Sequence, residues 1–331
     1  MTYNKNMKIL VTGGAGFIGS NLVNRSLKEG LNVKIVDDLS NGNKHFLSTL
    51  ALNNLMVSDF ASDEVLNEIK HGGYDAVIHL AAVPRVSYSV EYPIETNDTN
   101  VSKTLRLMEA CRGNVRRFVF ASSSSVYGDN KSLPANEDDD KRPNSPYALQ
   151  KSIIEDYLKL YHKLYGLDSA CLRFFNVFGP NQLGDSPYST AVSAWLTAIK
   201  SGRPMRSDGD GTQTRDMCYV DNVVDACLKA AKHEKSLNAE VFNIACGEGV
   251  SNRQILNYLM KRYPGSTYVD APWRPGDVMH TLADVVKSDW ALGYRPLVTF
   301  WQGLDKTIEW YDTNWETISK MRLRTLCNKK L

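Results

Sequence analysis

The chain has 331 residues, 43% hydrophobic and 23% charged, with a formal net charge of +2. This size and composition are those of a globular enzyme with one large α/β domain or two unequal ones sharing a cleft. The basic surplus lies in the last sixteen residues, where five basic residues face Glu316, which leaves no clustered basic face for nucleic acid.

We expect the basic tail to be a solvated end rather than a binding arm. No apolar run reaches membrane-spanning length, and the polar start MTYNKN does not have the pattern of a signal peptide or an anchor. The six cysteines form no C-x-x-C pair and lie mostly in apolar stretches. This favours reduced, buried thiols in a cytoplasmic protein and predicts no metal site.

Short β-rich runs alternate with amphipathic helical stretches from residue 7 onward. Runs that are apolar on both faces predict buried parallel strands at 7–12, 32–37, 55–59, 75–82, 117–123 and 169–175. Helices are expected between them at 17–29, 63–70, 94–112 and 145–165. This alternation predicts a doubly wound (Rossmann) parallel sheet with right-handed crossovers.

The pattern loosens after Asn176, where Gly and Pro become frequent. We expect residues 1–176 to form the nucleotide-binding domain and residues 177–331 to form mainly a smaller substrate-binding α/β part. A helix near 220–232 and a strand at 241–245 are expected to return to the main sheet.

The first predicted strand is followed by glycines at a spacing that suits a dinucleotide. Gly13 permits a tight turn, Gly16 permits close approach of backbone to a pyrophosphate, and Gly19 lets the next helix pack against the sheet. The N-terminus of that helix offers free N–H groups to phosphates. A glycine turn without a ligand is the alternative, which the flanking strand and helix disfavour.

Acidic residues end the next two strands. Asp37 can accept both hydroxyls of an adenosine ribose and would repel a 2′-phosphate, so NAD is preferred over NADP. Asp38 either shares this role or begins the following loop. Asp59 either reaches the adenine amine or caps its own strand end.

Residues 145–151, SPYALQK, predict a helix start with Ser145 as N-cap and Pro146 in the first turn. Tyr147 and Lys151 then stand one turn apart on one face. A free phenol has a pKa near ~10, so a neighbouring ammonium and an oxidised nicotinamide are needed to favour the phenolate at neutral pH. The preceding strand ends in a serine run, 122–125, whose hydroxyls could relay a proton or hold a substrate oxygen. A plain polar turn is the alternative for that run.

Motifs in this order resemble the extended short-chain dehydrogenase/reductases. GGAGFIGS, VDDLSNG, HLAA, SSSSVYG, SPYALQK, RFFNVFGP, GDGTQTRDMCYVDNVV and RPGD occur between residues 7 and 312. The sequence is most similar to the UDP-hexose 4-epimerase family, especially members that act on N-acetylhexosamines. The resemblance implies an NAD-dependent redox epimerisation at C4 in a homodimer that joins helices 94–112 and 145–165.

The resemblance also implies roles for individual residues. Tyr147 would be the acid/base, Lys151 would orient the ribose and tune Tyr147, and Ser123 and Ser124 would supply hydroxyls at the reacting carbon. The implied cofactor site comprises Gly13, Gly16, Phe17, Ile18, Gly19, Asp37, Asp38, Ser40, Asn41, Gly42, Asp59, Phe60, Leu80, Ala81, Ala82, Asn100, Lys151 and Phe174. The implied substrate site comprises Ser87, Ser123, Asn176, Arg215, Arg274, Asp277 and Thr281.

Arginines suit a nucleotide diphosphate because guanidinium binds phosphate in a bidentate manner. For Arg215 the alternative is a structural ion pair with Asp216 or Asp221. Thr281 aligns with a position that gates the sugar pocket in the resembled family, and its small side chain would admit an N-acetyl group. The loop VPRVSYSVEYP departs from that family's pattern, which leaves a uronic acid 4-epimerase possible, with Arg85 or another nearby cation facing the carboxylate.

Other reaction classes remain as alternatives. Sugar-nucleotide 4,6-dehydratases carry an Asp-Glu pair where this chain has Ser124 and Ser125, and the decarboxylases carry a glutamate at the second position, so both are disfavoured. A non-catalytic NAD sensor is disfavoured because such relatives usually lose the Tyr or the Lys.

Overall fold

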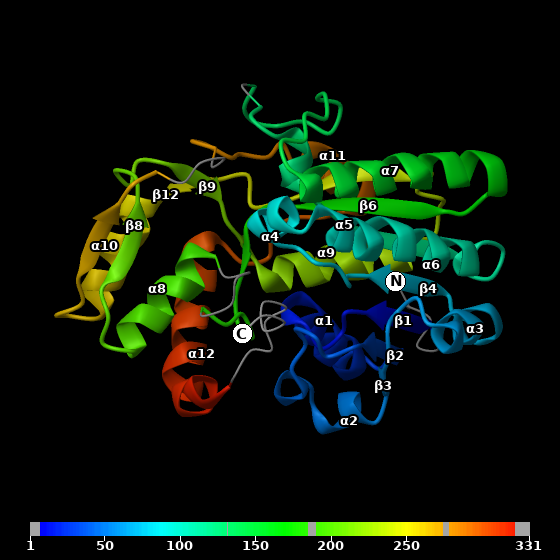
Figure 1. Ribbon diagram of the computed structural model, residues 1–331, viewed down its shortest axis with the longest axis horizontal. Helices are drawn as coiled ribbons and strands as arrows, with labels where there is room; N and C mark the ends of the chain where they lie inside the picture. Colours follow the sequence, from blue (N-terminus) through cyan, green and yellow to red (C-terminus); the bar gives the residue numbers. More distant parts are fainter. Residues whose placement is uncertain (1–6, 131, 185–189, 274–277, 322–331) are drawn as a thin grey trace.

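The structure is a computed structural model that describes residues 7–130, 132–184, 190–273 and 278–321. Its centre is a seven-stranded sheet with the order β11-β6-β5-β4-β1-β2-β3 (Figure 1). All neighbouring strands pair in parallel. The strands are β1 (Lys8–Thr12), β2 (Asn32–Asp37), β3 (Leu55–Val57), β4 (Ala76–His79), β5 (Arg117–Ser123), β6 (Ser169–Phe174) and β11 (Glu240–Ile244). The doubly wound sheet predicted from the sequence is confirmed.

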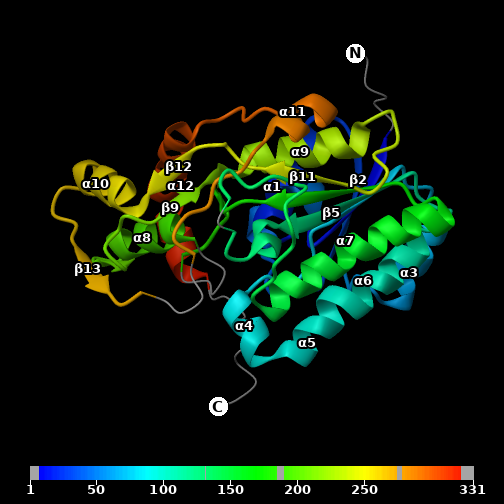
Figure 2. The same ribbon diagram turned by 90° about the horizontal axis from the view of Figure 1, so that it is seen from above.

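Helices cover both faces of this sheet. Figure 2 shows α3 (Asp63–His71), α6 (Lys103–Cys111) and α7 (Pro146–Tyr165) on one side, with α1 (Phe17–Lys28) and α9 (Val220–Lys232) on the other. Two buried apolar clusters fill the layers, and β1 shows how the sequence divides them. Ile9 and Val11 belong to the cluster under α1 and α9, whereas Leu10 belongs to the cluster under α6 and α7. This alternation explains why the central strands are apolar on both faces.

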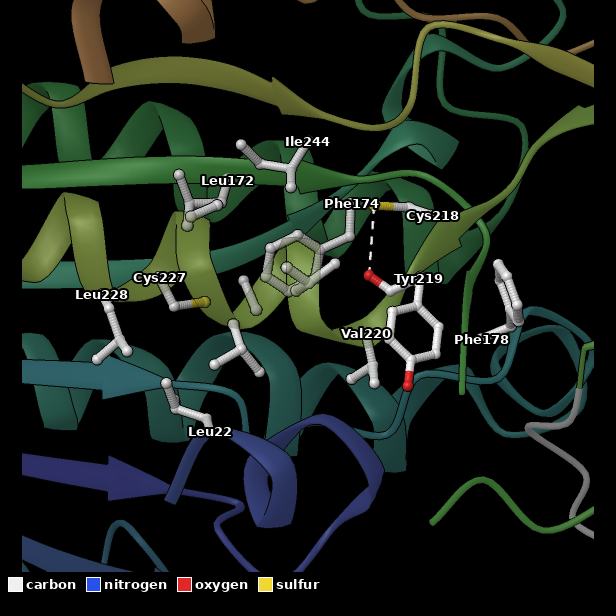
Figure 3. Close-up of a cluster of buried hydrophobic side chains, with 14 of the residues drawn as sticks. Leu22, Leu172, Phe174, Phe178, Cys218, Tyr219, Val220, Cys227, Leu228 and Ile244 are labelled. Carbon is white, nitrogen blue, oxygen red and sulfur yellow. Dashed lines mark hydrogen bonds between the residues drawn. The ribbon is translucent and has the colours of Figure 1, made fainter. Parts of the chain in front are cut away.

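Figure 3 shows part of the cluster under α9, where Leu172 and Phe174 of β6 lie among Cys227, Leu228 and other α9 side chains. The expected strand at 241–245 is present as β11, which pairs with β6. The chain therefore contributes a strand to the main sheet after residue 176.

The helix expected at 94–112 is divided. It consists of α5 (Pro93–Asn97), a π-helical turn η2 (Asp98–Ser102) and α6. The wide turn carries Asn100, whose amide oxygen accepts from the Val83 N–H at 2.8 Å and whose amide nitrogen donates to the Val83 carbonyl at 3.1 Å. This side chain holds the loop after β4, which gives the interruption a physical reason.

Several later elements, among them β8, β9, β12, α8, α10 and α12, lie beyond the main sheet, at the left of Figure 1. Three two-stranded pairs join β7 (Val177–Phe178) to β10 (Cys218–Tyr219), β9 (Thr214–Asp216) to β12 (Gly249–Ser251), and β8 (Met205–Asp208) to β13 (Tyr268–Ala271). The larger helices here are α8 (Ala191–Lys200), α10 (Asn252–Arg262) and α12 (Phe300–Lys320). Shorter ones are η1 (Lys44–Phe46), α2 (Thr49–Leu52), α4 (Val86–Glu91), η3 (Ser124–Tyr127) and α11 (Val286–Leu292). No helix among the described residues is long and apolar enough to cross a bilayer.

Candidate active site

A cleft of about 1690 Å³ lies at the carboxyl ends of the main strands. This volume exceeds the ~300–1,000 Å³ of a typical small-molecule pocket, so two ligands could lie in it together. Many of the predicted site residues line it: Gly13, Gly16, Phe17, Ile18, Gly19, Asp37, Asp38, Ser40, Asn41, Gly42, Asp59, Phe60, Leu80, Ala81, Ala82, Ser87, Ser123, Tyr147, Lys151, Phe174, Asn176 and Arg215. Many of these residues lie close together because parallel strands have their carboxyl ends at the same edge of the sheet.

The glycine turn after β1 brings backbone segments closer together than any side chain would allow. Gly13 has a φ of +70°, and a Cβ there would lie 2.7 Å from the Ala81 backbone nitrogen. A Cβ on Gly19 would lie 2.1 Å from the Gly13 carbonyl oxygen, so only glycine lets α1 begin here. The N-cap of α1 is Gly16, which leaves the first turn without a side-chain cap. The positive end of the helix therefore faces the cleft, as a pyrophosphate requires.

Asp37 ends β2 with its side chain almost wholly buried. Its carboxylate accepts the Ala15 N–H at 2.9 Å and the Leu39 N–H at 2.8 Å. Burial raises its pKa, against these two donors. The position fits the ribose of a dinucleotide. Asp38, in contrast, is exposed and accepts from both the N–H and the hydroxyl of Ser40, so its contacts are those of a residue that begins the loop.

Asp59 caps its strand end and also faces the cleft. Its Oδ1 accepts the Ala61 N–H at 2.8 Å, which caps the strand end, while its Oδ2 pairs with the Lys103 ammonium at 2.6 Å. Both Asp59 and Lys103 also line the cleft, where they could meet an adenine ring.

Tyr147 and Lys151 occupy the first two turns of α7. Ser145 caps the helix by accepting the Ala148 N–H at 3.2 Å, and Pro146 occupies the first turn, as predicted. The Lys151 ammonium donates to the Ala121 carbonyl at 2.7 Å and lies 5.8 Å from the centroid of the Tyr147 ring. Both side chains are buried where they line the cleft.

The ionisation of this pair differs from the expectation that Lys151 lowers the phenol's pKa. Burial raises the pKa of Tyr147 to about 12, and a hydrogen bond from Ser123 only partly opposes this. Burial also lowers the pKa of Lys151 to about 7, against the attraction of Glu155. The low dielectric therefore disfavours both charged forms, the phenolate and the ammonium.

Of the serine run 122–125, Ser123 places its hydroxyl at the phenol of Tyr147. Ser123 lines the cleft and accepts from the N–H of Ser125 at 3.2 Å and from its hydroxyl at 2.9 Å. Ser124 begins the 3₁₀ turn η3 and is not among the side chains that line the cleft. Its expected place at the reacting carbon is therefore not what this geometry gives, because the chain leaves the strand at Ser123.

Two further predicted site residues, Asn100 and Thr281, contact residues or loops of the cleft but do not line it themselves. Asn100 is buried against Val83 rather than at the cleft surface, so it holds the loop instead of contacting the cofactor side directly. Thr281 is likewise absent from the lining, but its hydroxyl accepts from the Asn176 amide at 3.2 Å and from the Asp216 N–H at 3.1 Å. Arg274 and Asp277 lie outside the described residues.

Arginines from the part of the chain after β6 also line the cleft. Arg215 lines the cleft and donates to the carbonyls of Thr214 at 3.0 Å and Met279 at 3.1 Å. The carboxylate considered as its structural partner, on Asp216, accepts three backbone N–H groups. Arg203 and Arg206, which the sequence analysis does not identify, line the same cleft. Their segment, SGRPMRSDGDG, is rich in Gly and polar residues, a pattern that predicts only a connection.

No group of three or more metal-ligating side chains is found among the described residues. The doubly wound sheet, the glycine turn and the buried Tyr147–Lys151 pair define an α/β enzyme of the dinucleotide-binding class. The model of the NAD dependent epimerase/dehydratase family matches residues 9–245, and the chain belongs to this family. It is thus an enzyme of the epimerase type with NAD as cofactor, which confirms those two predictions.

Similar proteins span nearly the whole chain. The UDP-glucose 4-epimerase of Mycolicibacterium smegmatis is 35% identical over 313 residues, covering 92% of this chain and 98% of the relative. The UDP-N-acetylglucosamine 4-epimerase of Methanobrevibacter ruminantium, solved with UDP-N-acetylmuramic acid, is 34% identical, covers 93% and 99%, and has a TM-score of 0.87. The UDP-glucuronic acid 4-epimerase of Bacillus cereus, solved with UDP-glucuronic acid and NAD, is 31% identical, covers 93% and 99%, and has a TM-score of 0.82.

Proposed function

We propose that this enzyme inverts the configuration at C4 of a UDP-hexose through a transient 4-keto sugar. The observation that carries the proposal is that Tyr147, Lys151 and Ser123 line the same cleft as the glycine turn and three arginines. The similar 4-epimerases, at 31–35% identity over almost the full chain, support the same reaction.

The glycine turn at Gly13, Gly16 and Gly19 and the carboxylate of Asp37 would hold NAD, which would supply the acceptor and donor of the C4 hydride and a positive ring that favours the phenolate. Tyr147 as phenolate takes the proton of the C4 hydroxyl and gives it back to the same oxygen after inversion. Ser123 holds that oxygen, and Lys151 orients the cofactor ribose. Burial, which raises the pKa of Tyr147 to about 12, also excludes water, so a nearby charge acts more strongly on the phenol.

The proposed reaction requires that the diphosphate be bound tightly and the hexose loosely. The 4-keto sugar must turn over within the cleft so that hydride returns to its opposite face. Arg203, Arg206 and Arg215 line the cleft and can hold the diphosphate, since guanidinium groups bind phosphate in a bidentate way; Arg206 also pairs with Asp208 at 2.8 Å. Arg274 and Asp277 are proposed to contribute to the nucleotide grip as well. A firm hold on the nucleotide then leaves the hexose free to rotate.

The preferred sugar is proposed to be an N-acetylhexosamine, alone or beside glucose and galactose, because Thr281 is small. A UDP-uronic acid is the alternative. It is favoured by Arg85, which lines the cleft and whose Nε donates to Ser87 at 2.8 Å, so that a cation stands near the sugar end. A 4,6-dehydratase or decarboxylase is disfavoured because Ser124 and Ser125 replace the acidic residues.

The test is direct. Purified enzyme is incubated with UDP-GlcNAc, UDP-GalNAc, UDP-Glc, UDP-Gal and UDP-GlcA, and the anomeric and H4 signals are followed by proton NMR. Inversion at C4 without net formation of NADH is the expected result. A 4-keto-6-deoxy product or steady NADH accumulation would place the enzyme in another reaction class.

A cytoplasmic homodimer is also proposed. Five cysteines of the described chain are free thiols, which suits a reducing compartment. The outer face of α5 and α7 exposes apolar side chains, among them Ile94 (85% exposed), Leu149 (49%) and Leu164 (56%). Such a stripe marks an interaction surface, here with a second copy. Leu164→Glu should shift the enzyme toward monomer in sedimentation velocity, and an unchanged sedimentation coefficient would contradict this assignment.

A further inference from the structure

Glu155 lies one turn after Lys151 on α7, and its carboxylate is almost completely buried. Oε1 accepts from the Ser122 hydroxyl at 2.6 Å and from Arg173 Nε at 2.9 Å, while Oε2 accepts from Arg173 Nη2 at 2.7 Å. The side chains of Glu155 and Arg173 are 1% and 2% exposed. A bidentate ion pair of this kind fixes both groups in one geometry. It ties α7 to the carboxyl ends of β5 and β6.

The contacts of β5 with α7 follow a regular order. Three consecutive residues, Ala121–Ser123, hold three side chains of the helix. The carbonyl of the first accepts from Lys151, the hydroxyl of the second donates to Glu155, and the hydroxyl of the third bonds to Tyr147. Any shift of the helix along the strand would change all three contacts together.

We infer that Glu155 is a positioning residue for the reaction. It holds Tyr147 and Lys151 of α7 in register with Ser122 and Ser123 of β5, and it keeps a negative charge facing the lysine. The inference rests on the proposed function for the chemistry that the positioning serves.

Stability alone does not explain such a pair. Burying two charges costs as much as their attraction returns, and apolar side chains of similar volume can replace buried ion pairs without loss. Apolar packing would not, however, place a negative charge one turn from Lys151. Stacking of Arg173 on the Tyr127 ring, at 4.6 Å from the ring centroid, adds a further constraint to the same geometry.

The other titratable groups near Lys151 do not supply the negative charge that Glu155 supplies. Facing Lys151 are Tyr147, whose phenol burial keeps protonated, and His79 of β4, whose pKa burial lowers to about 3 so that it is neutral. Glu155 thus supplies the opposing negative charge while burial lowers the pKa of Lys151 to about 7. Besides Lys151, the charged or titratable groups that face Glu155 include Arg173 and Cys171 of β6 and Lys141, whose ammonium is 3.9 Å away.

Glu155→Gln is the variant that tests the inference, since it keeps the size and one acceptor but removes the charge. Activity should fall about 10- to 100-fold, as when an outer-shell partner of a metal ligand is lost. The loss is expected in kcat, with KM for the UDP-sugar nearly unchanged, because no substrate contact is removed. The alkaline limb of the kcat profile should move to lower pH, since without Glu155 the lysine loses its proton more readily.

Asp168→Asn is the matched control. It removes the charge from a second ion pair, in which Nη2 of the buried Arg117 of β5 meets Oδ2 of the partly buried Asp168, just before β6, at 2.7 Å. This pair lies at the opposite end of β5 from Ser122. This variant should lower thermal stability without moving the pH profile. If Glu155→Gln does not fold, Glu155→Gln/Arg173→Met leaves no unpaired buried charge and takes its place.

A second readout needs no substrate. In protein labelled with [ε-¹³C]lysine, the resonance missing from Lys151→Met is assigned to Lys151 and titrated in each variant. A lower titration midpoint in Glu155→Gln, unchanged in Asp168→Asn, supports the inference. An unchanged midpoint and pH profile, or equal changes in the control, would overturn it. Absence of turnover by the wild-type enzyme with every UDP-hexose would instead contradict the proposed function.

Discussion

The side-chain amide of Asn176 donates a hydrogen bond to the hydroxyl of Thr281 over 3.2 Å, although 105 residues separate them in sequence. Asn176 lines the cleft directly after β6, whereas Thr281 stands immediately behind it. A change at Thr281 therefore reaches the cleft through Asn176, at the place where the proposed sugar pocket begins.

Thr281→Tyr tests the proposed sugar gate. An aromatic ring behind Asn176 should push into the pocket and exclude an N-acetyl group, while glucose and galactose still fit. Turnover of UDP-GlcNAc should be abolished and turnover of UDP-Glc retained, as measured by NMR. Thr281→Val keeps the volume and removes only the hydroxyl, so it should preserve the ratio of the two activities. Equal loss of both activities in Thr281→Tyr would refute the gate.

Asp37→Asn tests the choice of cofactor. The buried carboxylate of wild-type Asp37 should repel a 2′-phosphate. Removal of its charge should therefore lower the ratio of NAD affinity to NADP affinity by at least ~10-fold. Isothermal titration calorimetry with both dinucleotides measures the ratio. Asp38→Asn is the neighbouring comparison, and because Asp38 is exposed and engaged with Ser40 its effect should be much smaller. The reverse order of effects would show that Asp38, not Asp37, reads the ribose.

Lys151 should make the stability of the protein depend on pH. Its pKa is lowered to about 7 in the folded chain from an ordinary value of 10.5, so between these two values the unfolded chain binds one more proton. The contribution of this group to the free energy of unfolding therefore rises as pH increases from about 7 toward 10.5.

Lys151→Met lacks this dependence and serves as the reference. The variant should be the more stable protein near pH 6, and its advantage in urea unfolding should shrink as the pH rises to 10. A difference that stays constant with pH would mean that the lysine keeps an ordinary pKa in the folded protein.

Local signals in the sequence were sufficient for much of this site. The strands of the main sheet, the glycine turn and the cap formed by Ser145 depend on neighbours within a few residues, and the sequence predicts them. It does not identify Arg203 and Arg206 as site residues, because their place on the cleft wall depends on pairing of β8 with β13, some sixty residues further along the chain. No short-range pattern reports such a contact.

The two misplaced residues have a similar explanation. Ser124 was expected to continue the run of active-site hydroxyls, but the strand ends one residue earlier and the chain tightens into η3. Asn100 was expected at the cofactor, but the π-turn directs its amide to the loop at Val83. Both depend on where an element ends or widens, which hydrophobic periodicity does not specify.

Tyr147→Phe is the measurement that tests the account most directly, with interconversion of the preferred UDP-hexose followed by NMR. The variant keeps the ring but has no proton acceptor, so kcat should fall at least ~100-fold while NAD remains bound. Tyr161→Phe, on the exposed part of the same helix, should behave as the wild type. Retention of wild-type turnover by Tyr147→Phe would contradict the assignment of that phenol as the acid and base of the reaction.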